Sequence, residues 1–233
     1  MRTRGLVALC VCAATACPAL AGVIIQNRTA HFTSDLNNDI ILTFDTFDNQ
    51  GGTLILDDVR IDIRHAGGAV LRADNDDDFK SADVNGRIVR TWSLSGPDAL
   101  GFGNETVMTP SVHLDVNDGD GGDTNNFDPT PPDGTDFGSV AYGPLALAPI
   151  HPNEALYETN GPGTLDMTAD VLLMINDLQF VIPPDVWQLE VQDPYLDIDV
   201  TLTYFFSVIP VPPALWLGAV GLGVAGWIRR RVR

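Results

Sequence analysis

Cysteine is almost absent from this chain, and the few copies are confined to one end. The three cysteines, Cys10, Cys12 and Cys17, all lie within the first 17 residues. From residue 18 onward there is no thiol, which excludes a disulfide framework, a thiol nucleophile and a cysteine metal site there. A fold built from the remaining residues depends on its hydrophobic core.

Basic residues are scarce as well. The chain has 13 Lys and Arg against 31 Asp and Glu. Six arginines lie in residues 1–21 and 208–233, whereas every acid lies between these ends, so residues 22–207 carry 7 − 31 = −24 formal charges. Such a segment repels nucleic acid and anionic membrane surfaces, and it favours either the binding of divalent cations or simple solubility. We therefore expect no nucleic-acid partner.

A sustained helical period is also missing from residues 22–207. Apolar and polar residues alternate instead, in short runs separated by Gly, Asp and Pro, which predicts strands. The expected strands cover 39–47, 53–65, 69–73, 87–94, 105–116, 165–182, 187–191 and 195–206. Gly67-Gly68 is expected to be a hairpin turn, 165–182 to be two strands bent near Asn176-Asp177, and 118–149 to be a protruding loop. We predict an all-β fold, a single antiparallel β-sandwich or jelly-roll domain over residues 22–207.

Catalytic motifs are not found either. There is no G-x-S-x-G elbow and no P-loop, and the four histidines (His31, His65, His113 and His151) are isolated from one another. No spacing selects a carboxylate pair for glycoside hydrolysis. Trp92 and Trp187 are candidates for a sugar-stacking platform, with core packing as the alternative. We predict that the protein is not an enzyme, and a surface glycoside hydrolase remains the less favoured alternative.

The N-terminus has the pattern of a secretory signal peptide. Arg2 and Arg4 precede an apolar stretch, and Ala19-Leu20-Ala21 is an A-x-A site that predicts cleavage before Gly22. Residues 1–21 are therefore assigned to the signal peptide. The alternative is a lipoprotein site at Cys17.

The C-terminus has the pattern of a membrane segment. Pro210, Pro212 and Pro213 form an extended hinge because proline fixes φ and lacks a backbone donor. The uncharged stretch 214–228 would span roughly 22 Å as a helix, and 211–228 is at the short end of the spanning range. A cluster of arginines then predicts a stop on the cytoplasmic side: Arg229, Arg230, Arg231 and Arg233. A buried C-terminal helix is the alternative.

This order of hinge, apolar helix and arginines resembles the PEP-CTERM sorting signals of Gram-negative bacteria. The segment Pro210-Val211-Pro212-Pro213-Ala214 is similar to the Val-Pro-Leu-Pro-Ala variant, with Val211 where the Pro-Glu-Pro form has its acid. The resemblance implies that residues 208–233 hold the chain in the inner membrane until an exosortase, a membrane protease-transpeptidase, processes it near the prolines. The protein would then be delivered to the cell surface, outer envelope or extracellular matrix.

The body of the chain has a second resemblance. Residues 44–59 look like the opening of choice-of-anchor E domains, and residues 200–206 are similar to the final strand of that family. The resemblance extends roughly from Ile25 to Phe206. It implies a surface β domain carried on interchangeable anchors, and it implies no reaction and no catalytic residues.

Two acidic clusters are candidates for calcium binding, since Ca²⁺ takes six to eight oxygen ligands. The first offers Asp115, Asn117, Asp118, Asp120 and Asp123 on a glycine-rich backbone, although Pro129 stands where an EF-hand would need its last ligand. The second is Asp74–Asp78. A solvated loop is the alternative for both.

Together these patterns predict an exported, exosortase-processed surface or extracellular-matrix protein. Its role would be structural or adhesive, in association with exopolysaccharide or biofilm. The alternative function is a calcium-dependent carbohydrate-binding module.

Overall fold

The computed structural model describes residues 21–34, 39–119 and 127–209. These residues are almost entirely β, and the one helical element among them is a short 3-10 turn, η1 (Glu154–Leu156). The strands are β1 (Ala21–Phe32), β2 (Asp39–Asp45), β3 (Phe47–Asp48), β4 (Leu54–Asp74), β5 (Ala82–Gly96), β6 (Ala99–Met108), β7 (Val112–Leu114), β8 (Gly134–Ala146), β9 (Glu158–Thr159), β10 (Thr164–Phe180) and β11 (Gln188–Val208). Within these ranges no helix is long and apolar enough to cross a membrane.

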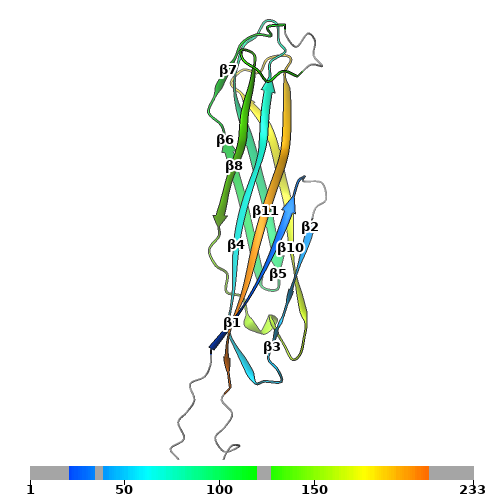
Figure 1. The fold of residues 1–233 in the computed structure, drawn as a ribbon, viewed down its shortest axis with the longest axis vertical. Coiled ribbons are helices and arrows are strands. Elements are labelled where there is room, and N and C mark those ends of the chain that lie inside the picture. The colour runs from blue at the N-terminus through cyan, green and yellow to red at the C-terminus, as the bar shows by residue number, and fades with distance from the viewer. Residues whose placement is uncertain (1–20, 35–38, 120–126, 210–233) are drawn as a thin grey trace, which may run out of the picture.

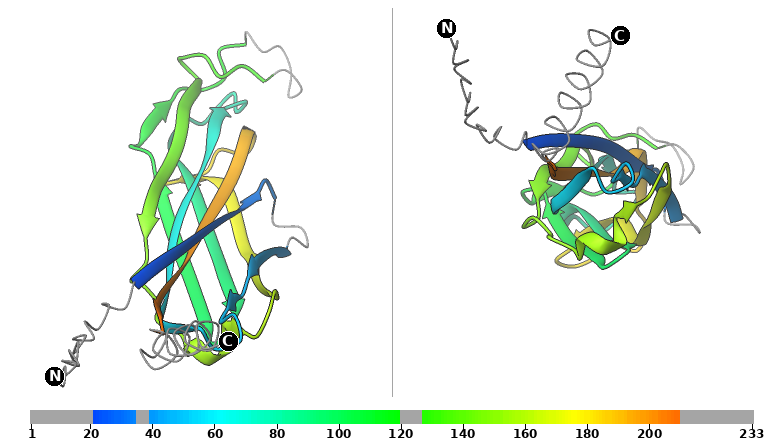
Figure 2. Two further views of the ribbon diagram at one scale, coloured as in Figure 1. Left: turned by 60° about the horizontal axis from the view of Figure 1, so that its bottom comes forward. Right: turned by 90° about the horizontal axis from the view of Figure 1, so that it is seen from below.

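Two antiparallel sheets pack face to face. Sheet A has the order β1-β11-β4-β8, and sheet B has the order β2-β10-β5-β6 with β7 also paired to β5. Figures 1 and 2 show the two layers along a long axis. The prediction of an antiparallel β-sandwich is confirmed.

Alternating side chains build the core between the sheets. In β11, Leu196, Ile198, Val200, Leu202 and Tyr204 are at most 1% exposed, while Asp197, Asp199 and Thr201 between them are more exposed. This is the two-residue period of a strand with one buried face. The largest buried cluster joins both sheets in the lower half and includes Phe32, Phe44, Phe47, Trp92 and Tyr157.

The predicted turn at Gly67-Gly68 is wrong, because β4 runs straight through both glycines. A Cβ on Gly67 would lie 2.9 Å from Tyr142 Cε1, and one on Gly68 would lie 2.8 Å from Tyr195 Cε1. The glycines therefore leave room for tyrosine rings on the neighbouring strands β8 and β11. Close packing, rather than chain reversal, explains this pair.

Three other predictions of chain breaks are also wrong. β10 is one strand whose irregularity lies between Val171 and Leu173, not near Asn176. Residues 188–191 and 195–206 belong to one strand, β11, with a bulge between Gln192 and Tyr195. β8 lies inside the stretch that was expected to be a loop, and β1 was not predicted.

The sandwich has two chemically distinct ends. Ala21 pairs with Ser207, so the first and last described residues lie together at one end, which we call the base. The connections β4–β5, β7–β8 and β10–β11 lie at the opposite end, which we call the distal end (residues 74–82, 115–119, 127–134 and 181–187).

Candidate functional site

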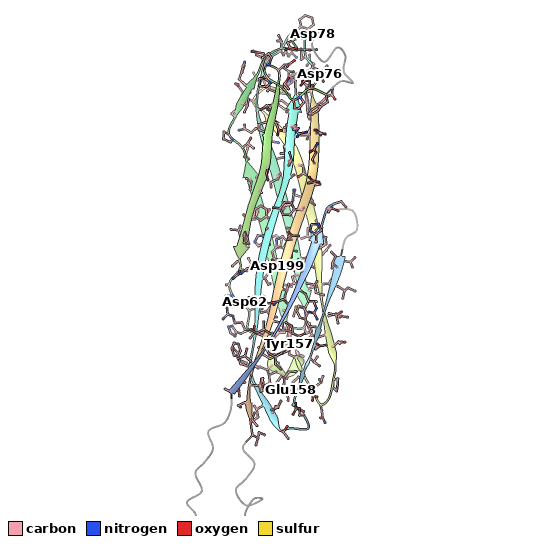
Figure 3. The ribbon with its side chains drawn as sticks, in the orientation of Figure 1. Asp62, Asp76, Asp78, Tyr157, Glu158 and Asp199 are labelled. Atoms are coloured by element: carbon pink, nitrogen blue, oxygen red, sulfur yellow. The ribbon has the colours of Figure 1, made fainter. Side chains whose placement is uncertain are left out.

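The distal end brings the two acidic clusters of the sequence together. Asn75 is fully buried, and its Nδ2 donates to the carbonyl oxygens of Lys80 (2.8 Å) and Asp115 (2.6 Å). The N–H of Asn117 donates to the carbonyl of Asp77 at 3.0 Å. Segments 40 residues apart in sequence therefore form one polar structure, at the top of Figure 3.

Two carboxylates of this end are buried with little compensation. Asp74 and Asp133 are 4% and 3% exposed. Asp74 Oδ2 accepts the N–H of Asp128 at 2.8 Å, and Asp133 Oδ2 accepts that of Asp118 at 3.0 Å. Asp133 Oδ1 has no hydrogen-bond partner. A buried carboxylate oxygen without a donor is costly, and a bound cation would relieve that cost.

The electrostatics of Asp74 point the same way. Burial raises the pKa of Asp74 to about 6, against the lowering effect of the Asp128 N–H, and the charges of Asp76, Asp133 and Asp128 raise it further. The neutral form of Asp74 is therefore favoured below about pH 6, and the charged form at neutral pH would be stabilised by a nearby positive charge. Asp133 was not among the residues predicted from the sequence, because it lies beyond both acidic clusters.

The predicted calcium ligands are brought together only in part. Asn117 Oδ1 accepts the N–H of Gly119 at 2.9 Å, and the side chain of Asp115 is 62% exposed near His113. Asp120 and Asp123 lie outside the described residues. Within the described ranges, no three His, Cys, Asp or Glu side chains form a group that could hold a metal ion. Calcium binding stays a prediction.

Asp77 has a structural use instead. Its carboxylate accepts the backbone N–H groups of Phe79, Lys80 and Asp185 at 2.7 to 3.1 Å. These bonds lower the pKa of Asp77, the Asp185 bond contributing most. The residue fixes the β4–β5 turn against the β10–β11 connection.

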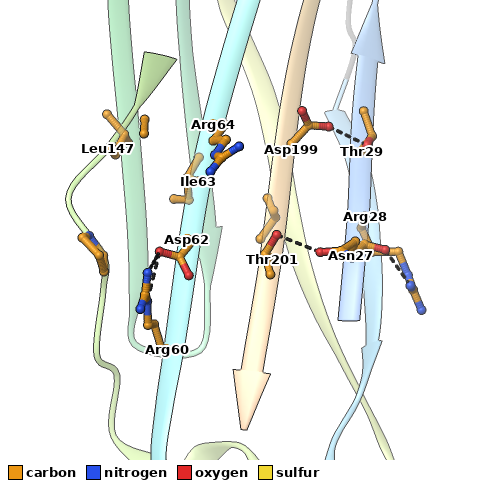
Figure 4. Close-up of a pocket in the computed structure, with 13 residues that line it drawn as sticks. Asn27, Arg28, Thr29, Arg60, Asp62, Ile63, Arg64, Leu147, Asp199 and Thr201 are labelled. Carbon is orange, nitrogen blue, oxygen red and sulfur yellow. Dashed lines mark hydrogen bonds and ion pairs between the residues drawn. The ribbon is translucent and has the colours of Figure 1, made fainter. Parts of the chain in front are cut away.

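A groove of about 710 Å³ lies on the outer face of sheet A. Its floor consists of β1, β11 and β4, and its wall is the segment from Ala146 to Pro149 that follows β8 (Figure 4). Outward-facing polar side chains form two rows across the strands. The pairing register places Thr29, Asp199 and Arg64 in one row and Asn27, Thr201 and Asp62 in the next.

Some groups of the groove are paired and others remain open. Thr29 Oγ1 donates to Asp199 Oδ1 at 2.6 Å, and Thr201 Oγ1 donates to Asn27 Oδ1 at 2.8 Å. Arg60 donates twice to Asp62 Oδ1, at 2.6 and 3.0 Å. Arg64 lies opposite Asp199 in the register, yet it makes no hydrogen bond or ion pair to any described residue.

A buried polar cluster lies between the two halves of the core. Arg90 is fully buried on β5 and donates to the carbonyls of Gly68 and Tyr195 in sheet A and of Ile175 in sheet B, so it joins the two sheets. His65 packs against Trp92 and Tyr142, with ring centroids 5.0 and 5.6 Å away. His65 Nδ1, Trp92 Nε1 and Tyr142 Oη have no hydrogen-bond partner.

The aromatic and histidine candidates do not form a site. Trp92 is fully buried in the lower core, whereas Trp187 packs on Phe180 beyond the end of β10. Burial lowers the pKa of His65. The other three histidines contact separate aspartates: His31 with Asp197, His113 with Asp83, and His151 with Asp58.

The processing signals lie largely outside the described residues. Ala19 and the segments 210–214 and 229–233 are among the residues that are not described. Ala21 and Gly22 begin β1, where they pair with Ser207 and Phe206. Cleavage before Gly22 would leave almost all of β1 in place.

Comparisons with known proteins give no family. No family model matches the chain, and no curated protein matches it. The solved structures with some likeness are infectious bursal disease virus particles. The T13 viral particle aligns with TM-score 0.22 and 13% identity, covering 82% of this chain and 41% of that one. The Gx strain aligns with TM-score 0.21 and 12% identity, covering 82% and 44%. The chain thus spans less than half of these viral proteins.

Proposed function

We propose that this is an exported, exosortase-processed protein of the bacterial cell surface or extracellular matrix, with a structural or adhesive role associated with exopolysaccharide. The observation that supports this most is the position of the chain ends. Ala21 and Ile209 both lie at the base, with Ile209 N–H bonded to the Thr53 carbonyl. Both predicted processing segments therefore attach at one end, and the distal end points away from the anchor.

The strand order supports the finer assignment to a jelly roll. When the eight long strands are numbered along the chain, sheet A reads 1-8-3-6 and sheet B reads 2-7-4-5. This is the order of one long hairpin rolled into two sheets, as in double-sheet jelly rolls. Such folds serve binding and assembly in many proteins, so function is argued from the surface and not from the topology.

Deletion of residues 210–233 in the native host tests the sorting proposal. The truncated chain should appear in the medium as soluble protein, because the predicted anchor is gone. The double substitution Pro212→Ala, Pro213→Ala is the matched control. It keeps the apolar helix and the arginines, and should leave an unprocessed protein in the inner membrane. An unchanged location of the truncated protein would defeat the proposal.

A calcium-dependent carbohydrate-binding module is the second candidate, favoured by one observation. Asp133 Oδ1 is buried without a donor beside the buried Asp74. Calorimetric titration of the full chain with Ca²⁺ at pH 7.5 should release heat and raise the melting temperature. Asp133→Asn should weaken binding, while Asp166→Asn on the outer face of sheet B should not. If Ca²⁺ gives neither heat nor a melting shift, this candidate fails.

A further inference from the structure

The groove on sheet A has open hydrogen-bonding groups of both kinds. Asp199 and Asp62 each use one carboxylate oxygen, so the other oxygen is an acceptor with no partner among the described residues. The Arg64 guanidinium and the Asn27 amide nitrogen are donors that are similarly unused. A hydroxyl group both donates and accepts, so a ligand rich in adjacent hydroxyls satisfies such a mixed surface.

The spacing of these groups is fixed by the sheet. Rows two residues apart lie about 7 Å from each other along a strand, and neighbouring strands lie about 4.8 Å apart. Arg64 and Asp199 face each other across β4 and β11, and Asp62 and Asn27 lie in the next row with Thr201 between them. The open groups thus form an array rather than a single point.

The wall of the groove is held in place by the backbone. Leu147 N–H donates to the Ile63 carbonyl at 3.0 Å, and Ile61 and Ile150 exchange two bonds at 2.9 and 3.0 Å. Ala146, Leu147 and Pro149 therefore present an apolar surface at a fixed distance from the polar floor. A preformed site with apolar walls and a few placed polar groups is typical of small-ligand recognition.

Charge selects the class of ligand. Arg28 lines the groove, but its guanidinium donates to the Thr43 carbonyl at 2.8 Å and lies over the Phe44 ring, away from β11 (Figure 4). Arg60 is neutralised by Asp62. The remaining pair, Arg64 and Asp199, sums to zero. Since residues 22–207 carry −24 charges, a polyanion is repelled before it reaches the groove.

We propose that this groove binds a neutral polyhydroxylated saccharide, with Arg64 and Asp199 as the central contacts. The inference deepens the exopolysaccharide association proposed above and relies on it only for the place where the ligand is met. Alternating hydrogen-bond donors and acceptors recognise vicinal hydroxyls, and the Ala146–Pro149 wall packs against the C–H face of the sugar. Recognition of this kind depends weakly on salt, because no net charge is neutralised.

Affinity electrophoresis of the full chain in mild detergent tests the proposal with defined probes. Dextran, galactomannan and neutral xylan are the neutral polymers, and alginate is the anionic comparison. Retardation is expected on at least one neutral polymer and not on alginate. Arg64→Ala and Asp199→Ala should each weaken binding about tenfold, because each removes charge-assisted hydrogen bonds.

Asp166→Ala is the matched control for Asp199→Ala. Asp166 on sheet B accepts Thr43 Oγ1 at 2.7 Å, the same cross-strand pair that Thr29 and Asp199 form on sheet A at 2.6 Å. This control should bind within about twofold of wild type, with all variants checked by melting temperature. The proposal is overturned if no neutral polymer retards the chain or if the chain binds alginate more strongly. It is also overturned if Asp166→Ala weakens polymer binding as much as Asp199→Ala does.

The two proposals fail separately. Loss of saccharide binding with correct surface location overturns the groove alone. A purified chain that binds saccharide but stays in the inner membrane or cytoplasm of its host overturns the sorting proposal alone.

Discussion

The lower half and the distal end of the sandwich both contain buried side chains, but those of the lower half are apolar and several of those at the distal end are polar or charged. Around Phe44 and Trp92 the interior is a continuous apolar cluster. At the distal end the buried residues include Asp74, Asn75 and Asp133, and the apolar clusters beside them are small. Burial of apolar area stabilises independently of pH, whereas buried carboxylates respond to protons and cations. The molecule thus separates a stable base from a distal end whose stability depends on conditions.

Arg90 lies at the boundary between these regions. Its guanidinium bonds to backbone carbonyls of both sheets rather than to a carboxylate, and burial lowers its pKa. The bulge of β11 lies directly before Tyr195, and the Tyr195 carbonyl accepts a hydrogen bond from Arg90 Nε. A buried cation without a buried anion is retained only when several acceptors surround it.

The largest loss of stability is expected from a substitution in the apolar lower half of the sandwich. Phe44→Ala should lower the free energy of unfolding by about 3 to 5 kcal/mol, because the ring is fully buried and leaves a cavity. Phe102→Ala is the control, since Phe102 is 54% exposed on sheet B and should change stability by about 0.5 kcal/mol or less. Urea denaturation measures both. Equal losses in the two variants would contradict the placement of the core.

The next largest effect is expected for Arg90→Met, which should lower the free energy of unfolding by about 3 kcal/mol. The substitution keeps much of the side-chain length but leaves the carbonyls of Gly68, Ile175 and Tyr195 without that donor. Arg87→Met, which breaks the partly exposed ion pair with Asp177, should cost about 1 kcal/mol or less. If both variants unfold at the same urea concentration, Arg90 does not join the sheets as described.

Asp74→Asn should stabilise the protein, and only at neutral pH. Because the folded pKa is raised to about 6, the stability contribution of Asp74 is full below pH 4 and is lost as the pH rises through 6. At about 1.4 kcal/mol per pKa unit, the amide should gain up to about 3 kcal/mol at pH 7.5 and almost nothing at pH 4.

The control for that effect is Asp78→Asn, on an exposed aspartate of the same turn. It should leave the urea midpoint nearly unchanged at both pH values. A gain from Asp74→Asn that is equal at pH 4 and pH 7.5 would show that the buried charge is not its cause.

The sequence predicted the sandwich because period-two alternation is a local signal. The buried faces of β11 and β2, with Leu202 and Phe44, follow directly from it. It misjudged Gly67-Gly68, since glycine marks both turns and close approaches, and only the tyrosines of other strands distinguish them. β8 was hidden because its residues are polar on the outer face and sparse in aliphatic side chains.

The sites were less predictable than the fold. The acidic clusters were visible, but their union through Asn75 depends on the long-range pairing of β4 with β8 and of β7 with β5. The groove has no sequence signature, because Asn27, Asp62 and Asp199 lie on three strands and meet only through the register. From the sequence alone, Thr29 and Asp199 look like ordinary residues on the outer face of a sheet. Only the structure shows that the segment from Ala146 to Pro149 lies beside them and makes a groove.

The most direct test of the proposed location and orientation is to label the protein on intact cells, once at its distal end and once at its base. With the signal peptide removed, the predicted mature chain has no cysteine, so wild type is an unlabelled control. Two variants are treated with a membrane-impermeant maleimide: Asp78→Cys at the distal end (Figure 3) and Thr53→Cys at the base, where the Thr53 carbonyl accepts the Ile209 N–H. If the distal end faces away from the anchor at the cell surface, both variants are labelled on intact cells and Asp78→Cys reacts faster. Labelling that appears only after the envelope is broken would contradict the proposed location, and faster reaction at Thr53→Cys would contradict the proposed orientation.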